Sequence, residues 1–371
     1  MTDTFLAGYY GMRNSGDDAL LAVTAWGARH FLRAEKLVAS AARLPVLPGL
    51  DGVRGLYRCG NEARDHSRLV RMERRLCSFI GGLTTRRVIF GGGSVFHTHG
   101  DLRDKITLMR CAAARGHVAL GVGIGPFRDS RAEKTCAELL KRLSFVGVRD
   151  EESLGIARAI APDANVEKTF DLAPLLGDAL AVAPPAPGAP RRGIGIALCK
   201  DELESDRDER IVERVAQAIL RLPSWIAYEV VLIDFNGHDS HGDAPLHRRL
   251  AERLRNLIPI RHLPYDPNPA NVLRAISGLD AIVAMRLHAA VFGFLADTPT
   301  TLLSYHPKCD GWARDIGLSS KMVHDCEDLD PAALASSIES AIHGGARPTL
   351  SRQMARDAAL LNWTYAKDLA A

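Results

Sequence analysis

Short apolar runs alternate with longer amphipathic segments along the first half of the chain. The apolar runs predict strands because they have the length and composition of buried strands and end in Gly or polar residues. They lie at residues 4–10, 36–39, 87–90, 118–125 and 145–150. Helical periodicity separates most of them, for example over residues 131–143. Alternating strands and helices of this kind predict a parallel sheet.

The same alternation restarts after a segment rich in Pro, residues 183–190 (APPAPGAP), which cannot continue a strand or a helix. Strands are predicted at residues 193–198, 228–233, 261–263, 279–285 and 300–305. Helices are predicted at residues 208–222, 250–257, 268–277, 289–296, 331–342 and 353–369. The fold class is therefore α/β, with two Rossmann-like domains that have parallel sheets and face each other across a cleft.

The predicted domains follow from these boundaries. Residues 1–182 form an N-terminal Rossmann-like domain, and residues 183–192 form a linker. Residues 193–345 form a second Rossmann-like domain, and residues 346–371 form a C-terminal helix that packs back on the first.

The junction at residues 279–294 (LDAIVAMRLHAAVFGF) carries the most informative chemistry. A buried strand ends in Arg286-Leu287-His288, and a buried helix follows at once. Ligands of α/β proteins bind at the carboxyl ends of strands, and a helix amino terminus offers N–H groups to an anion. Arg286 lies between two apolar runs and needs a partner, which an anionic ligand would supply. His288 adds a group that can transfer protons. An anion site is favoured here over a satisfied helix-start histidine and an arginine in a domain-interface salt bridge.

The first strand leads into a loop with Gly11, Asn14 and Gly16, and Asp17 or Asp18 suits the start of the following helix. Gly11 and Gly16 permit close backbone approach. The loop is not GxGxxG, so nothing supports a dinucleotide site. A ligand-binding loop and a tight turn with a capping Asp remain equally good interpretations.

A second glycine-rich segment, residues 91–94 (GGGS), follows a predicted strand and includes Gly92, Gly93 and Ser94. Three consecutive glycines are entropically costly, so a ligand or a helix must approach the backbone closely, and a ligand is favoured. His97 and His99 lack a third metal ligand. The glycines at residues 121–125 could line the cleft or allow close packing, and the sequence favours neither role. Residues 149–153 are interpreted as a charged helix start rather than as catalytic residues.

The composition narrows the class of protein. Of 371 residues, 47% are hydrophobic and 25% are charged, which is typical of a globular chain. A net charge of +3 gives no reason to expect nucleic acid. Seven cysteines without a CxxC pair suggest reduced thiols in a cytosolic protein and no metal. Neither a membrane helix nor a signal peptide is evident. The basic residues 68–75 (RLVRMERR) suit a solvated helix face better than contact with anionic lipid.

Five segments, in this order, resemble the polysaccharide pyruvyl transferase family. They are GYYGMRNSGDDALL at residues 8–21, FGGGS at 90–94, VGVRDEES at 146–153, SGLDAIVAMRLHAAVFGF at 277–294 and TLLSYHPKCDGW at 301–312. The resemblance implies a fold like that of GT-B glycosyltransferases. It also implies transfer of the enolpyruvyl unit of phosphoenolpyruvate to two hydroxyls of one sugar, which forms a pyruvate ketal and releases phosphate.

The resemblance also suggests roles for particular residues. The family's Arg-Leu-His signature falls on Arg286, Leu287 and His288 and is associated with the donor. We expect Arg286 to bind the carboxylate or phosphate of the donor and His288 to supply a proton or stabilise the departing phosphate. Asp17, or Asp18, is the candidate base for the protons of the sugar hydroxyls. His306 and Lys308 extend the donor site, and the acceptor or cleft residues are Gly11, Asn14, Gly16, Asp18, Gly92, Gly93 and Ser94.

The resemblance implies no cofactor, and it implies a glycan or a lipid-linked saccharide as acceptor. The expected location is the cytosol, and a peripheral contact with the inner membrane and a homo-oligomer stay open. Two alternatives remain. One is a GT-B glycosyltransferase that uses a nucleotide sugar, with Glu202 or Asp234 as the acid for a ribose. The other is a saccharide-binding protein that catalyses nothing.

Overall fold

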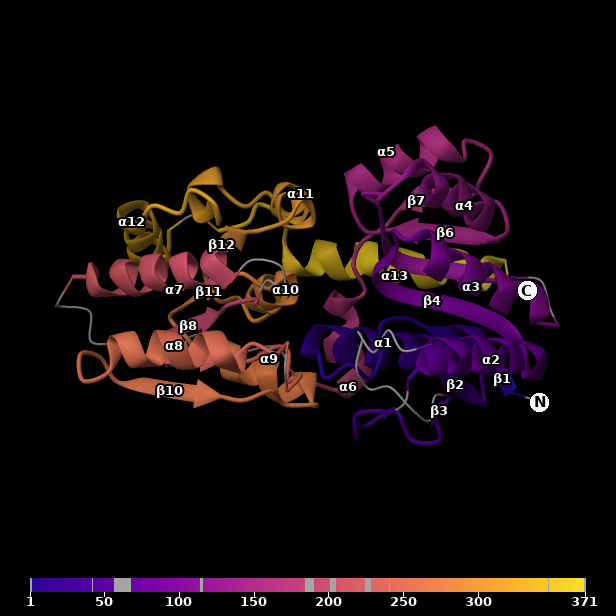
Figure 1. Cartoon of the computed structure of the whole chain (residues 1–371), viewed down its shortest axis with the longest axis horizontal. Coiled ribbons are helices and arrows are strands. Elements are labelled where there is room, and N and C mark those ends of the chain that lie inside the picture. Colours follow the sequence, from indigo (N-terminus) through magenta and orange to yellow (C-terminus); the bar gives the residue numbers. More distant parts are fainter. Residues whose placement is uncertain are drawn as a thin grey trace. The chain divides into compact units, whose positions relative to one another are not determined.

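The computed structural model describes residues 2–41, 43–56, 68–113, 116–183, 190–200, 205–223, 228–239, 241–345 and 347–369. The chain divides into two compact units (Figure 1). The first unit contains Met1–Met12, Asp17–Val182 and Gln353–Ala371, and the second contains Arg13–Gly16 and Ala183–Arg352. The chain thus enters the second unit briefly at residue 13, well before the division at residue 182 that the sequence suggested.

The first unit is built on a parallel sheet of seven strands in the order β3-β2-β1-β4-β5-β6-β7. The strand order reverses between β1 and β4, as in doubly wound folds. The strands are β1 (Thr2–Ala7), β2 (Leu37–Ala39), β3 (Arg54–Gly55), β4 (Thr85–Phe96), β5 (Val118–Ile124), β6 (Phe145–Val148) and β7 (Val166–Lys168).

Helices cover both faces of this sheet (Figure 1). On one face, α2 (Arg68–Thr84), α3 (His99–Cys111), α4 (Ser130–Leu140) and α5 (Glu151–Ile160) pack in sequence against one another. On the other, α1 (Ser15–Leu32) packs against α13 (Arg352–Asp368), where the rings of Phe31 and Trp363 stack at 5.8 Å. The turn η1 (Ala173–Leu175) and helix α6 (Leu176–Leu180) follow β7.

The second unit contains a parallel sheet of six strands in the order β10-β9-β8-β11-β12-β13. Its strands are β8 (Ile194–Ala197), β9 (Val230–Ile233), β10 (Ile260–Leu263), β11 (Ala281–Ala284), β12 (Thr300–Ser304) and β13 (Val323–Asp325). The central strands are almost wholly apolar and buried because helices cover both faces. The helices are α7 (Ser205–Leu220), α8 (Ala244–Leu254), α9 (Pro269–Ser277), α10 (Leu287–Leu295), α11 (Pro307–Ile316), η2 (Ser320–Met322) and α12 (Pro331–Ile342).

The predicted α/β class with two parallel sheets is confirmed, but the prediction that the glycine run of residues 91–94 follows a strand is wrong. These residues lie inside β4 and pair with β5 through Gly93 and Val122. Gly92 and Gly93 have φ values of 73° and 80°, which only glycine adopts easily. The run therefore distorts the strand without ending it, and the pairing shifts register between Ser94 and Phe96.

Two parts of the earlier interpretation fall outside the described residues. They are residues 184–189 of the predicted linker and Glu202. Within the described residues, no helix combines the length and the apolar character needed to cross a membrane.

Candidate functional site

The carboxyl edge of the second sheet carries the predicted donor residues. The strand order reverses between β8 and β11, and such a switch point is where open α/β sheets bind ligands. Cys199 lies just beyond β8, Asp234 follows β9, Arg286 follows β11 and Tyr305 follows β12. Since all of these strands are parallel, these four residues share one edge of the sheet.

Arg286 is held by a buried carboxylate of its own unit. Its Nε donates to Asp243 Oδ1 and Oδ2 at 3.1 and 3.2 Å, and its Nη2 donates to Oδ1 at 2.5 Å. The Asp243 side chain is fully buried and that of Arg286 is 17% exposed. Burial alone would lower the pKa of Arg286, but the charge of Asp243 raises it above its usual range. Asp243 therefore supplies a partner for Arg286 within the protein, where the sequence analysis favoured an anionic ligand.

Asp243 also fixes the backbone that follows β9. It precedes α8, but it accepts hydrogen bonds from the backbone N–H groups of Phe235 and Asn236, at 3.0 and 2.8 Å, and caps no helix N–H. In the sequence Asp243 looks like an ordinary helix-start residue before Pro245. Its pairing with a residue 43 positions away left no local signal, and the sequence analysis missed it.

His288 is the second residue of α10 and lies against the N-terminal loop. A Cβ atom on Gly16 would lie 2.3 Å from both Cγ and Nδ1 of His288. No side chain fits at position 16 unless the imidazole moves. Gly16 is thus a site of close approach, as the sequence predicted, and the group that approaches it is His288.

Backbone hydrogen bonds hold residues 13–16 in the second unit. Ser15 N–H donates to Phe235 O at 2.9 Å, and Gly237 N–H donates to Arg13 O at 2.8 Å. Asn14 forms a bridge with Asn236 and accepts the Gly16 N–H at 3.0 Å through Oδ1. The loop that resembles the family's N-terminal signature is therefore attached to the segment that Asp243 fixes.

Three further groups lie along the same sheet edge. Burial raises the pKa of both the Cys199 thiol and the Tyr305 hydroxyl, so both stay protonated near neutral pH and neither is a reactive nucleophile. Lys308 Nζ lies 5.2 Å from the centroid of the Tyr305 ring. His306 caps α11 by accepting the Lys308 N–H at 3.2 Å through Nδ1, which leaves Nε2 as the protonated nitrogen of a neutral ring.

Other predicted site residues have different surroundings. Leu287 is buried in α10. In the first unit, a Cβ on Gly11 would lie 2.3 Å from Arg43 O, and one on Gly92 would lie 2.7 Å from the Leu20 side chain. Asp17 and Asp18 lie in the first turn of α1, and Asp18 is buried. The close neighbour of Gly11 and of Gly92 is therefore protein, although a ligand was favoured for the glycines of β4.

Ser94, an exposed residue, accepts a hydrogen bond from the buried Arg149 at the carboxyl edge of the first sheet. Arg149 Nη2 donates to Ser94 Oγ at 2.9 Å, and Arg149 Nε donates to Asp150 at 3.2 Å. Asp150 also caps α5 by accepting the Ser153 N–H at 2.8 Å, in keeping with a charged helix start. These contacts link the ends of β4 and β6.

Among the described residues, one group has the ligand types of a metal site: Asp234, His247 and His262. His247 Nε2 accepts a hydrogen bond from the Leu198 N–H at 3.0 Å. His247 Nδ1 lies 2.5 Å from Asp234 Oδ1, to which it is hydrogen-bonded. Both imidazole nitrogens of His247 are therefore engaged in hydrogen bonds. The group acts as a polar network, buried at Asp234 and His247 and exposed at His262, that joins β10 to the ends of β8 and β9.

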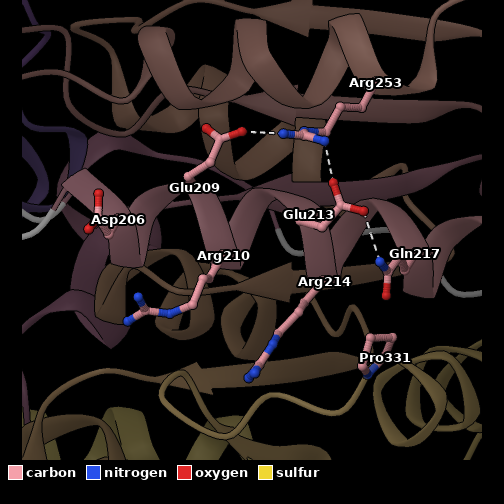
Figure 2. A pocket seen from close by; sticks show the side chains of 8 residues that line it. All are labelled: Asp206, Glu209, Arg210, Glu213, Arg214, Gln217, Arg253 and Pro331. Carbon is pink, nitrogen blue, oxygen red and sulfur yellow. Dashed lines mark hydrogen bonds and ion pairs between the residues drawn. The ribbon is translucent and has the colours of Figure 1, made fainter.

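A separate hollow of about 580 Å³ lies along the outer face of α7 (Figure 2). Its charges largely satisfy one another, since Arg253 pairs with both Glu209 and Glu213, and Gln217 donates to Glu213 at 2.8 Å. Three acids (Asp206, Glu209 and Glu213) balance the three arginines (Arg210, Arg214 and Arg253) that line it, so the hollow has no net charge to attract an anion.

The comparisons with known proteins bear on this edge of the second sheet. The model of the family described as polysaccharide pyruvyl transferase matches residues 14–307, well over half of the chain. The chain belongs to the polysaccharide pyruvyl transferase family. The matched range includes the loop at residues 13–16, apart from Arg13, together with Asp243, Arg286, His288 and His306. No curated protein matches the chain.

Solved structures similar to this pyruvyl transferase family member show its fold. UDP-GlcNAc 2-epimerase from Methanocaldococcus jannaschii, in complex with UDP-GlcNAc and UDP, is 9% identical with a TM-score of 0.60, over 98% of this chain and 100% of that one. UDP-GlcNAc 2-epimerase from Neisseria meningitidis, bound to UDP-GlcNAc, is 10% identical with a TM-score of 0.58, over 92% of each. Anabaena Alr3699/HepE, in complex with UDP-glucose, is 14% identical with a TM-score of 0.54, over 99% and 98%. The fold is GT-B.

Proposed function

We propose that this protein transfers the enolpyruvyl unit of phosphoenolpyruvate to a sugar of a surface glycan or of its lipid-linked precursor, forming a pyruvate ketal. One observation carries the proposal. Arg286, fixed by Asp243, stands at the switch point of the second sheet, at the start of α10 and two residues from His288. This arrangement offers an oriented cation, a helix amino terminus and a proton-transfer group together.

The donor would bind through several positive groups. Asp243 engages Nε and Nη2 of Arg286, which leaves Nη1 to point at a carboxylate or phosphate oxygen. The partial positive charge at the amino terminus of α10 adds to this attraction, and Lys308 adds a full charge from the next strand's end. Since Asp243 cancels much of the charge of Arg286, these additional groups matter for a donor that carries several negative charges.

The chemistry needs a proton on C3 of phosphoenolpyruvate, which makes C2 electrophilic. The first sugar hydroxyl adds to C2 and loses its proton, and the second hydroxyl then displaces phosphate from C2 and loses its proton. We assign the proton donor to His288, whose ring position the backbone of Gly16 restricts. Asp17 follows Gly16 in the chain and is our candidate base for the hydroxyl protons.

Calorimetric titration with phosphoenolpyruvate tests the donor assignment. Arg286→Ala should weaken binding by about tenfold or more, because it removes a charge-assisted contact. Arg261→Ala is the matched control, since Arg261 is an exposed arginine of the same unit paired with Glu229, and it should bind like the parent. Unchanged binding by Arg286→Ala would exclude the proposed donor site.

Phosphate release in the presence of free and lipid-linked saccharides tests the role of His288. His288→Ala should keep donor binding and lose about 100-fold or more in turnover if it supplies the proton. Full turnover by His288→Ala would remove it from the mechanism.

A nucleotide-sugar transferase is the second candidate, because the solved structures named above contain UDP-sugars or UDP. Thermal-shift measurements with phosphoenolpyruvate and with UDP-sugars separate the two, since a ligand raises the melting temperature of the protein that binds it. Stabilisation by a UDP-sugar alone would favour the second candidate.

A further inference from the structure

Helix α2 of the first unit exposes a continuous apolar stripe. Five large apolar side chains are each between 44% and 67% exposed, and all five lie on this helix: Met72, Leu76, Phe79, Ile80 and Leu83. Their spacing of three and four residues places them on one side of the helix. Scattered apolar residues are normal on a protein surface, but a contiguous patch of this kind marks an interaction site.

The inner face of α2 explains why these residues point outward. Gly81 and Gly82 are buried there, and a Cβ on Gly81 would lie 2.5 Å from the Phe5 ring. A Cβ on Gly82 would lie 2.6 Å from Cys111 Cβ. The helix thus packs closely through these glycines and keeps the five apolar residues of the stripe on the surface. This is the reverse of the usual amphipathic arrangement.

Basic residues accompany the stripe. The first two turns of α2 contain four arginines (Arg68, Arg71, Arg74 and Arg75) and one acid, Glu73, a net charge of +3 from 4 − 1. A groove of about 810 Å³ runs between α2 and α3, and Arg75, the exposed Arg103, Glu73 and Asp104 line it. Arg75 pairs with Asp104 at 3.2 Å, so the charges of the groove itself balance and the net positive charge belongs to the first turns of α2. The apolar side chains Met72, Leu76 and Phe79 line the same groove.

We infer that α2 and its groove with α3 dock on the surface of an anionic lipid bilayer. An apolar stripe on a helix whose first two turns have a net charge of +3 matches such a surface, where apolar side chains enter the acyl boundary and cations meet the headgroups. A second copy of this chain fits less well. A two-fold dimer places the same patch on both subunits, so it would bring a net charge of +3 against another +3.

This inference does not rest on the proposed chemistry, and it reverses the preference for a solvated helix face that the basic sequence suggested. The exposed apolar residues favour docking over a solvated face, because a solvated face would carry polar side chains at these positions.

Sedimentation of the full-length protein with vesicles tests the inference. The protein should sediment with vesicles of phosphatidylcholine and phosphatidylglycerol, much less with phosphatidylcholine alone, and less at high salt. Leu76→Asp/Phe79→Asp should lower the partition coefficient about tenfold or more, since each apolar side chain that enters the acyl boundary contributes on that scale. The control Val46→Asp/Leu257→Asp changes two apolar residues exposed elsewhere and should bind like the parent.

A measurement on the parent protein tests the inference even if the double variant folds poorly. Amide hydrogen exchange of the parent should slow in α2 when anionic vesicles are added. Absence of sedimentation and of this protection would overturn the inference. So would a dimer in solution that Leu76→Asp/Phe79→Asp dissociates, combined with no binding of the parent to vesicles, because α2 would then be a subunit interface.

Discussion

Individual buried charges in this protein are matched by charges from distant parts of the chain. Arg286 and Asp243 are 43 residues apart and form a bidentate pair with little solvent contact. A buried pair of this kind adds little net stability, but it is costly to break, because one charge is then left without a partner. The pair therefore fixes the direction of the Arg286 side chain more than it stabilises the fold.

Asp243→Asn is expected to lower the free energy of unfolding by about 3 kcal/mol or more, because it leaves Arg286 buried without its counter-charge. Asp239→Asn is the matched control. Asp239 pairs with Arg13 at 2.9 Å, but its side chain is 93% exposed, so its loss should cost at most about 1 kcal/mol. Urea denaturation measures both values. Equal effects of the two variants would show that burial does not strengthen the dependence of Arg286 on Asp243.

Gly16→Ala is expected to destabilise the protein by about 1–3 kcal/mol, since the new methyl group overlaps the His288 ring. A shift of the ring should also reduce turnover, by up to about 100-fold for a displacement near 1 Å. Gly155→Ala serves as the control. It lies in α5 with no atom within 4 Å of the added Cβ, and it should stabilise by about 0.5–1 kcal/mol. If Gly16→Ala kept the stability and turnover of the parent, the loop would not restrict His288.

At the scale of elements, the sequence predicted most of the alternating strands and helices. It missed features that depend on contacts between distant parts of the chain. Buried strands such as β9 and β11 are apolar throughout, so their positions followed from composition. The extension of β4 through residues 91–94 did not, because glycine usually ends an element and here Leu20 and Thr24 of α1 demand it. Helix α2 was predicted only as a solvated helix face over residues 68–75, and its continuation to Thr84 was missed, since Gly81 and Gly82 lie on its buried side.

One side chain that links neighbouring elements makes stability depend on pH. His117, just before β5, accepts the Val88 N–H of β4 at 3.2 Å through Nδ1, and burial lowers the pKa of the ring. An unfolded chain binds a proton at an ordinary pKa of about 6.5, whereas the folded protein resists it. The contribution of His117 is thus fully present above about pH 6.5 and is lost as the pH falls from there towards the folded pKa.

His117→Asn should be less stable than the parent at pH 7.5, by about 1–3 kcal/mol, since a buried hydrogen bond is disturbed. It should also lose less stability than the parent between pH 7.5 and 5.5, because the titrating ring is gone. Melting temperatures at the two pH values give both quantities. His30→Asn, at an exposed position, should behave like the parent, and an identical pH response of all three proteins would contradict the role of His117.

At the scale of the whole molecule, chain order and spatial order differ. Residues 13–16 lie in the second unit although both flanking segments lie in the first, and residues 353–371 return to the first unit after the second is complete. The apolar pattern predicted two α/β halves but carried no sign of this early excursion. It depends on two hydrogen bonds with the segment after β9: Ser15 N–H donates to Phe235 O, and Arg13 O accepts from Gly237 N–H. Only those residues of the candidate site that lie at a strand-to-helix junction were predicted from the sequence. Arg286 and His288 followed from a strand-to-helix transition, whereas Asp243 required the folded structure.

The returning helix α13 should determine the stability of the first unit through Asn362. This fully buried residue accepts the Gly121 N–H and the Thr169 hydroxyl at 2.8 Å each, and it donates to Phe170 O at 3.1 Å. Asn362→Ala leaves buried backbone groups without partners and should cost about 3 kcal/mol or more. Gln353→Ala, at an exposed position of the same helix, should cost less than about 0.5 kcal/mol.

Hydrogen exchange locates the effect of Asn362→Ala. Exchange should accelerate in β5, β6 and β7, which surround Asn362, and remain at the parent's rate in β8 and β11 of the second unit, because local unfolding proceeds in contiguous cooperative units. Since β8 and β11 flank Arg286, donor binding by this variant should also match that of the parent. Equal acceleration in both sheets would show instead that the two units unfold together and that α13 stabilises the whole chain.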